Sequence, residues 1–300
     1  MSWIVAGLMA PFLWALTNLI DQIKVRKYFV GNPLLITTLG GFVSTLLALY
    51  IAIFHRELWQ IPFDTGIVFS TTAFFDCLAF LAYYKALQKD EASNVAPVFQ
   101  ILPILIFMMG YFFLKETIST QQIIGSAFII SAALCLMIDF KTHSFKWSTL
   151  CYMTVCCMVL ATNTILNRNA LEDTNWYTAI AWKFIGFSVF SIVVVCINKK
   201  IRSDCIAQIK NPINMGVFLL VTAEIAGLLA NMCFLISLDK TPAAGLAMTL
   251  NGFQPAYVLL LTYVACKIYP QHFEKPKTGV HLIWHLGCLV AMIFGLYLIY

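Results

Sequence analysis

Charged residues are scarce in this sequence. Asp, Glu, Lys and Arg together make up 11% of the 300 residues, and hydrophobic residues make up 61%. A soluble domain usually carries about 25% charged residues, so the composition excludes an ordinary soluble globular protein. The connectors between the apolar segments are also short, which leaves no room for a separate soluble domain.

The sequence also lacks the usual signatures of catalysis and of metal binding. It contains no nucleophile elbow, no phosphate-binding loop and no HExxH motif. Its ten cysteines have no metal-ligand spacing, and nearly all lie in or at the ends of apolar segments, where small apolar packing accounts for them. We therefore predict that the protein is not an enzyme, has no catalytic residues and needs neither a metal nor a cofactor.

Two further absences concern the start of the chain and its partners. The first residues, "MSWIVAGLMAPFLWAL", have no positively charged leader region and no small-residue cleavage site, so we expect a retained first helix. The net charge of +5 does not indicate a nucleic-acid partner. The basic residues lie in short connectors, where they orient a protein in the membrane. The expected surroundings are therefore membrane lipid.

What the sequence does contain is a series of apolar segments, each long enough for a membrane helix, which needs about 20 residues. We count ten, at about 2–23, 33–54, 66–87, 93–114, 120–138, 148–168, 176–198, 213–237, 242–266 and 281–300. The predicted fold class is an all-α polytopic membrane protein of an inner or plasma membrane, with ten transmembrane helices.

The basic residues predict the orientation of these helices. Apart from Lys183, fourteen Lys and Arg residues fall in one alternate set of connectors, and four fall in the other: Arg56, Lys115, Arg168 and Lys240. Because Lys and Arg are enriched in cytoplasmic loops, the richer set should be cytoplasmic. Both termini should then face away from the cytoplasm.

The chain repeats itself in order. "LTNLI" at 16–20 corresponds to "ATNTI" at 161–165, and the acid Asp76 corresponds to Glu224 in "VTAEIAGLLAN". "ALQKDEASNVAPVFQILP" at 86–103 likewise matches "SLDKTPAAGLAMTLNGFQP" at 237–255. We therefore predict a first repeat over 1–142 and a second over 147–300. Five helices is an odd number, so the second repeat should be inverted, as in many secondary transporters.

These segments also resemble a known family. "KALQKDEASNVAPVFQILPILIF" at 85–107 and "FLKETIS" at 113–119 look like the EamA-like branch of the drug/metabolite transporter superfamily. In that family an acidic residue follows the fourth helix of each half, and Glu116 matches it here. The second half departs from the pattern, because "ACKIYPQHF" has no acid at this place. The resemblance implies a ten-helix carrier that moves small metabolites by alternating access, commonly as an exporter.

Polar side chains recur at helical spacing in six of the predicted helices. Residues at i, i+4 and i+7 share one helix face, as Trp14, Asn18 and Asp21 do. Such stripes predict a shared polar interior. The candidate substrate-binding residues are Trp14, Asn18, Asp21, Asp76, Tyr83, Asn163, Trp182, Lys183, Glu224, Asn231, Asn251, Gln254 and Tyr257.

The deep charges narrow the substrate class. Asp76, Glu224 and Lys183 lie near mid-depth, where a charge costs roughly 3 kcal/mol on insertion scales. Lys183 can neutralise at most one acid, so the interior should favour a proton, a sodium ion or a cationic substrate. Asp21 lies nearer a helix end and could pair with Lys24.

We therefore predict a proton-coupled secondary active transporter of small organic cations, such as polyamines like putrescine. A first alternative is an amino-acid or general metabolite exporter, in which Lys183 binds a substrate carboxylate. A second alternative, from another class, is a non-transporting membrane enzyme or scaffold. The substrate's identity, the direction of flux and the coupling ion stay open at this point.

Overall fold

In the computed structural model the chain is entirely helical over the part that it describes, residues 2–29, 31–55, 61–89, 95–137, 147–210, 215–268 and 280–299. The first half contains α1 (Trp3–Ile23), extended by a π-helical turn over Lys24–Tyr28, then α2 (Pro33–Phe54) and α3 (Phe63–Lys89). Its fourth helix has three parts, a 3₁₀ turn (Ala96–Gln100), α5 (Ile101–Met109) and a π turn (Gly110–Leu114), and is followed by α6 (Thr120–Met137).

The second half repeats this order with one addition. It contains α7 (Trp147–Ala170), α8 (Trp176–Ile197), the additional α9 (Lys199–Lys210) and α10 (Met215–Lys240). Its fourth long helix is also interrupted, as α11 (Ala244–Thr249), a 3₁₀ turn (Leu250–Phe253) and α12 (Gln254–Ile268), before α13 (Val280–Ile299).

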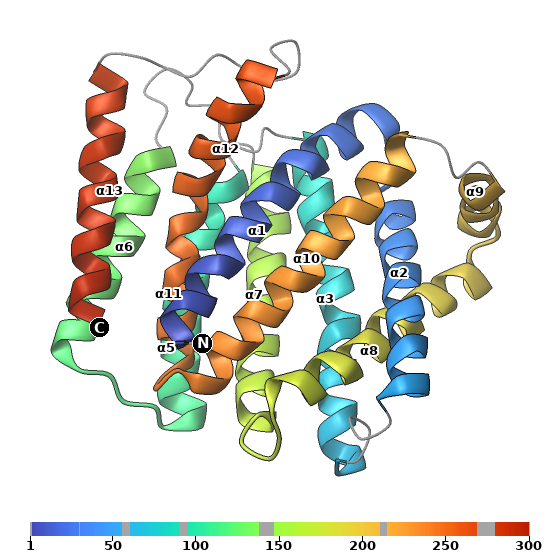
Figure 1. Cartoon of the computed structure of the whole chain (residues 1–300), viewed down its shortest axis with the longest axis horizontal. Helices are drawn as coiled ribbons and strands as arrows, with labels where there is room; N and C mark the ends of the chain where they lie inside the picture. The colour runs from blue at the N-terminus through green and yellow to red at the C-terminus, as the bar shows by residue number, and fades with distance from the viewer. Residues whose placement is uncertain are drawn as a thin grey trace.

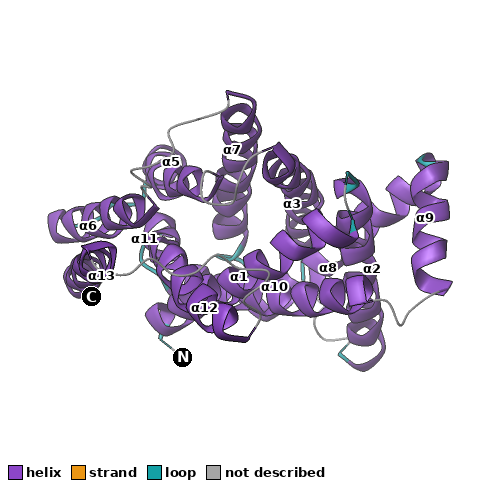
Figure 2. Cartoon of the chain, turned by 90° about the horizontal axis from the view of Figure 1, so that it is seen from above, coloured by secondary structure: helices purple, strands orange, loops and turns teal. Residues whose placement is uncertain are grey.

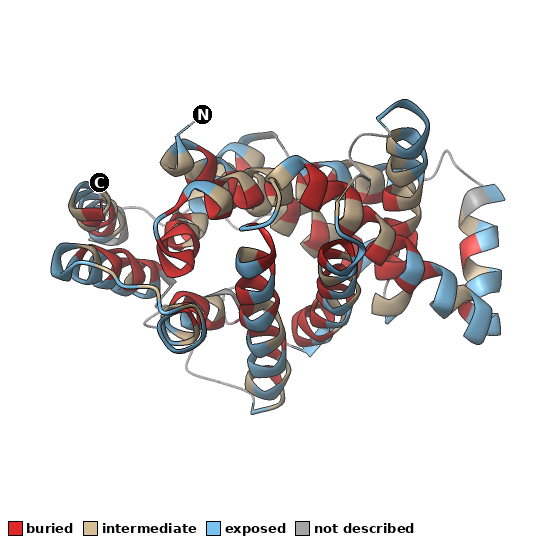
Figure 3. Cartoon of the chain, turned by 90° about the horizontal axis from the view of Figure 1, so that it is seen from below, coloured by how far each residue is buried: buried red, intermediate tan, exposed pale blue. Residues whose placement is uncertain are grey.

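Ten apolar helices agree with the ten predicted membrane segments. Among the described residues, seven helices are long and apolar enough to cross a membrane. Three shorter apolar helices cover Val98–Leu114, Thr120–Leu136 and Ile283–Ile299. Figure 3 shows buried residues facing the interior and exposed residues on outer helix faces, and the exposed residues include many large apolar side chains such as Phe112, Ile53 and Val290. This all-helical, multi-pass arrangement confirms the predicted fold class.

Corresponding helices of the two halves run in opposite directions. In Figure 1, α1 rises where α7 descends, α3 rises where α10 descends, and α6 rises where α13 descends. The packing follows the same symmetry, because α1 lies on α10 as α3 lies on α7. Two further neighbouring pairs, α2 with α8 and α6 with α13, each join a helix to its own counterpart. The chain is therefore built from two inverted sets of helices, although residues 138–146 between them lie outside the described residues.

The helices α2 and α8 have matching N-caps, which align their residue positions. The Asn32 side chain accepts a hydrogen bond from the Leu35 backbone N–H at 3.3 Å, and Asn175 accepts one from the Thr178 N–H at 3.2 Å. A capping oxygen of this kind satisfies one of the free N–H groups at a helix start. Since both helices begin at an Asn, positions at equal distance from the two caps correspond.

The helix α9 departs from the sequence prediction, which placed only a short connector between residues 198 and 213. Asn198 caps it, since its side chain accepts from the Lys200 and Ile201 N–H groups at 3.1 Å. Ile201 and Cys205, one turn apart, are buried, and basic residues such as Lys199 are exposed. Figures 1 and 2 show α9 at the edge of the molecule, at the end opposite α6 and α13. The missed signal was the recurrence of apolar residues at helical spacing in this charged segment, which is typical of an amphipathic helix.

Candidate substrate cavity

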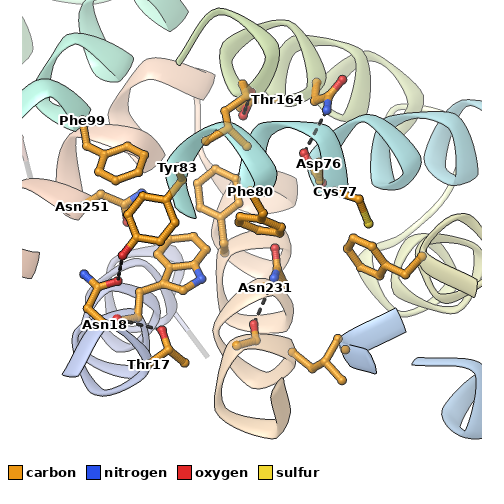
Figure 4. Close-up of a pocket in the computed structure, with 18 of the residues that line it drawn as sticks. Thr17, Asn18, Asp76, Cys77, Phe80, Tyr83, Phe99, Thr164, Asn231 and Asn251 are labelled. Carbon is orange, nitrogen blue, oxygen red and sulfur yellow. Dashed lines mark hydrogen bonds between the residues drawn. The ribbon is translucent and has the colours of Figure 1, made fainter. Parts of the chain in front are cut away.

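A cavity of about 210 Å³ lies between the two halves. Eleven of the thirteen predicted residues line it: Trp14, Asn18, Asp21, Asp76, Tyr83, Asn163, Lys183, Glu224, Asn231, Asn251 and Gln254. Figure 4 shows several of them facing one another, with Asn18 and Tyr83 on one side of the cavity and Asp76 on another. The polar stripes inferred from helical spacing therefore do meet in one interior.

Asp76 is fully engaged by the second half. Its Oδ2 lies 2.9 Å from Lys183 Nζ, and its Oδ1 accepts a hydrogen bond from Asn163 Nδ2 at 2.8 Å. Both ionised side chains are buried, with 4% of the Lys183 and 9% of the Asp76 side chain exposed. A buried charge needs such partners, because desolvation without them costs several kcal/mol. The structure thus identifies Asp76 as the acid that pairs with Lys183.

A second layer of hydrogen bonds holds this pair in position. Asn163 Nδ2 also donates to the Thr72 carbonyl at 2.9 Å, and the Thr72 hydroxyl donates to Asn167 Oδ1 at 2.7 Å. Thr72 and Asp76 belong to α3, whereas the two asparagines belong to α7. The contact between the halves is therefore a polar network with its donors and acceptors matched.

Glu224 has no comparable partners. Its side chain lines the cavity and is partly exposed there, and it makes no ion pair or hydrogen bond with any described residue. Its carboxylate lies against Gly40 of α2: a Cβ at that position would be 2.6 Å from Glu224 Cδ. The acid therefore occupies space that exists because residue 40 has no side chain.

The end of α1 supplies a third acid, which is paired within its own chain segment. Lys24 Nζ lies 2.7 Å from Asp21 Oδ1, as the sequence had suggested, and both residues are buried. About one turn earlier on α1, Asn18 Oδ1 accepts a hydrogen bond from the Tyr83 hydroxyl at 3.2 Å. About two turns earlier, Trp14 packs on Phe234 with ring centroids 5.6 Å apart. This side of the cavity is therefore aromatic as well as polar.

The charges that surround the cavity do not cancel. Asp76 is paired with Lys183 and Asp21 with Lys24, which leaves Glu224 without an ion pair among the described residues, although the Lys24 charge acts on it at longer range. If all three acids are ionised, the described cavity carries one net negative charge. Within the same part of the chain, no three His, Cys, Asp or Glu side chains come together in a way that could hold a metal ion.

Two predicted aromatic residues lie outside the cavity wall. Trp182 packs against Gly66 and against Phe63, with ring centroids 6.2 Å apart, because it precedes Lys183 on α8 and so lies about 100° around the helix. Tyr257 packs edge-to-face on Phe12 at 5.5 Å, one turn beyond Gln254. Of the polar residues that do line the cavity, Asn231 donates to the Gly227 carbonyl of its own helix at 3.0 Å, and Asn251 Nδ2 lies 2.8 Å from Met248 Sδ.

An ionic cluster lies where several helix ends meet. Arg168, in the last turn of α7, donates through Nε to Glu116 at 3.2 Å and through its terminal nitrogens to the carbonyls of Leu238 and Thr241 at 2.6 and 3.0 Å. The other Glu116 oxygen accepts from the Ala244 N–H at 2.9 Å. The cluster therefore joins the ends of α7 and α10 to the start of α11 and to the turn that follows residue 114.

Comparisons with known proteins agree with this architecture. The profile of the EamA-like transporter family matches residues 1–138 and again residues 147–274. The chain belongs to the EamA-like transporter family. This membership confirms the resemblance within the drug/metabolite transporter superfamily, and it means that the protein is a multi-pass transporter of a small molecule and not an enzyme.

Individual relatives of this EamA-family protein match one half of it. An uncharacterized transporter in the cobO 3′ region of a Sinorhizobium species is 26% identical over 141 residues, which is 46% of this chain and 97% of the relative. An uncharacterized protein of Methanocaldococcus jannaschii is 28% identical over 138 residues, 45% of this chain and 96% of the relative. Both relatives thus have about the length of a single half.

A solved structure supports the fold of the whole EamA-family chain. One crystal structure superposes with a TM-score of 0.71 at 14% identity, covering 99% of this chain and 95% of the other. At this identity the likeness concerns the fold alone.

Sequence reasoning missed two functional candidates in this EamA-family protein, Gly40 and Arg168. The signal for Gly40 was a Gly-Gly pair inside an apolar helix, since small residues allow close approach in membrane proteins. Arg168 was counted only as a topology charge, although it is one of just four basic residues in the sparse set of connectors.

Proposed function

We propose that this EamA-family transporter carries small organic cations, such as amines, by alternating access and in exchange for protons. The observation that supports this most is the Glu224 carboxylate, which lines the cavity without an ion pair to any described residue. A substrate with one positive charge would neutralise the cavity. The aromatic rings of Trp14, Phe80 and Tyr83 line the same space and can face an ammonium group, an interaction that contributes roughly 0.5–2 kcal/mol.

Coupling to protons follows from the use of a single carboxylate. A proton and an organic cation both neutralise Glu224, so they exclude each other there. Sodium would compete in the same way. If the transporter changes conformation only when the cavity is neutral, a proton and an organic cation must be exchanged for each other across the membrane.

The polyamine hypothesis needs a further step in this conformation. A diamine such as putrescine would have to bind both Asp76 and Glu224, but the Asp76 carboxylate is held by Lys183 and Asn163. Cations with one ammonium group therefore fit the observed pairing better, and a diamine must displace the Lys183 ammonium. The zwitterion alternative requires the same displacement, because the Lys183 ammonium must leave Asp76 to bind a substrate carboxylate.

We further propose that residues 1–142 and 147–300 act as the two units of alternating access, with the substrate held between them. The Arg168 cluster would close one entrance, and breaking it would be part of the conformational change. Both termini would lie on the non-cytoplasmic side, as the basic residues predict. A reporter fused to Tyr300 tests the orientation, since alkaline phosphatase should be active there and a fluorescent protein dark.

Flux in proteoliposomes tests the function. Vesicles that contain the purified protein should take up a radiolabelled primary amine when a proton gradient is imposed. Protons should leave the vesicle lumen in proportion to the amine that enters it. Glu224→Gln should remove this flux. Transport of an uncharged or anionic metabolite by both the parent and Glu224→Gln, with no movement of amines, would contradict the proposal.

A further inference from the structure

The two inverted halves place equivalent residues on opposite sides of the cavity, and one equivalence is between a lysine and a glycine. Counting from the N-caps Asn32 and Asn175, Gly40 and Lys183 are each the eighth residue into their helices. Gly40 belongs to α2 and Lys183 to α8, which are packed against each other as counterparts. The second half therefore has an ammonium group where the first half has only backbone.

The acids that face these two positions lie on counterpart helices, about one turn apart in register, because Asp76 lies 13 residues before the end of α3 and Glu224 lies 16 residues before the end of α10. Lys183 lies 2.9 Å from Asp76, which belongs to the third helix of the other half. Gly40 lies against Glu224, which belongs to α10, the counterpart of α3, in the opposite half. One acid thus has its cation supplied by the protein, whereas the other lies against a residue without a side chain and lines the cavity.

The asparagine that contacts Asp76 also has a counterpart in the other half. Asn163, from the "ATNTI" motif of α7, donates its amide N–H to Asp76. Asn18, from the matching "LTNLI" motif of α1, lines the same cavity as Glu224. Its carbonyl oxygen accepts from the Tyr83 hydroxyl, and its Nδ2 donates to no described residue. An acid and an amide donor are therefore both available on the open side.

We infer that Gly40, Glu224 and Asn18 form the vacant counterpart of the Lys183–Asp76–Asn163 group, and that the substrate supplies the missing ammonium on an unbranched alkyl chain. This inference rests on the proposed function and narrows its substrate class. In the occupied group the nitrogen donates to a carboxylate at 2.9 Å. A primary ammonium can make that contact, whereas a quaternary ammonium has no N–H and its methyl groups hold the nitrogen farther from the acid.

Gly40 is then a specificity-determining position. The three heavy atoms nearest to a Cβ at this position all belong to the flexible carboxylate end of Glu224. The neighbouring Gly41 differs, because a Cβ on it would lie 2.6 Å from the Phe187 backbone carbonyl of α8. Residue 40 can therefore be varied within the cavity, and a lysine at 40 would bring its own ammonium to Glu224.

The test uses n-butylamine, which reproduces the lysine side chain, with purified full-length protein in detergent at fixed pH and salt. Isothermal titration should show one site for n-butylamine in the parent protein. N,N,N-trimethylbutylammonium should bind about tenfold more weakly or worse, because a charge-assisted hydrogen bond is lost. Gly40→Lys should weaken n-butylamine binding at least about tenfold more than Gly40→Met, a side chain of similar length without charge.

The possible outcomes separate the two levels of the proposal. Equal binding of the two ligands by the parent protein, no binding of n-butylamine, or equal effects of Gly40→Lys and Gly40→Met would overturn the inference. If Glu224→Gln binds n-butylamine as the parent does, the proposed function itself fails. If Glu224→Gln loses binding while the two Gly40 variants behave alike, the inference alone fails. The ligand comparison in the parent protein decides even if neither Gly40 variant folds.

Discussion

The two halves of this protein treat the acids on counterpart helices α3 and α10 differently. Around Asp76, α3 packs closely on α8: the Ser70 hydroxyl donates to the Trp182 carbonyl at 2.9 Å, and Gly186 lies against the Ser70 backbone. Around Glu224, α10 makes far fewer contacts with α2, and the acid faces the cavity. The comparison teaches that a repeat can keep one copy of a charged group as internal structure while the other copy stays open for a ligand.

The largest expected effect on stability comes from breaking the Lys183–Asp76 ion pair. Lys183→Ala leaves the Asp76 carboxylate buried without its cation, which should cost about 3–5 kcal/mol of unfolding free energy. The measurement is thermal or denaturant unfolding of the purified protein in detergent. The matched control is Asp76→Asn combined with Lys183→Met, which removes both charges and should recover most of the loss. Equal losses in the single and double variants would show that the pair is not the source of the stability.

A smaller effect is expected from the ionic cluster around Arg168. Arg168→Met removes hydrogen bonds from a charged donor to the Leu238 and Thr241 carbonyls and to Glu116. The expected loss is about 1.5–3 kcal/mol, the range for hydrogen bonds of charged groups. Lys240→Met, which removes an exposed charge near the same helix end, should change stability by less than about 0.5 kcal/mol. Unfolding midpoints that are equal for the two variants would contradict a role for the cluster.

The two adjacent glycines of α2 sharpen the comparison further. Gly41→Ala forces α2 away from the Phe187 carbonyl of α8 and should cost about 1–3 kcal/mol, as overpacking usually does. Gly40→Ala displaces only the Glu224 side chain and should cost less. Thermal midpoints of the two variants, measured side by side, test this order. A larger loss of stability for Gly40→Ala would mean that the Glu224 side chain is rigidly held and that it cannot move to bind a ligand.

Much of this arrangement could be predicted from the sequence. The parts that could not be predicted have one physical cause in common. The helices and the inverted repeat follow from apolar length and from motifs such as "LTNLI", because a membrane tolerates few alternatives to a helix. Eleven of the thirteen predicted residues reach the cavity because helical spacing fixes which residues share a face.

Pairing was harder to predict, because it depends on how helices from different halves are rotated and how closely they approach. The sequence indicated that Lys183 needs an acid but left Asp76 and Glu224 equal as candidates. Trp182 shows the same limit: one residue's difference around α8 moves a side chain from the cavity to a helix contact. Gly40 could be recognised only once the two N-caps had aligned α2 with α8.

The most direct test of the account is calorimetric titration of a primary amine into three proteins: the parent, Glu224→Gln, and the double variant Asp76→Asn with Lys183→Met. The account predicts one site in the parent, loss of that site in Glu224→Gln, and a site of nearly unchanged affinity in the double variant, because the Asp76–Lys183 pair contributes no net charge. The loss in Glu224→Gln should be at least about 1.5–3 kcal/mol of binding free energy. Binding that survives in Glu224→Gln and disappears in the double variant would contradict the account, since the occupied group would then be the site.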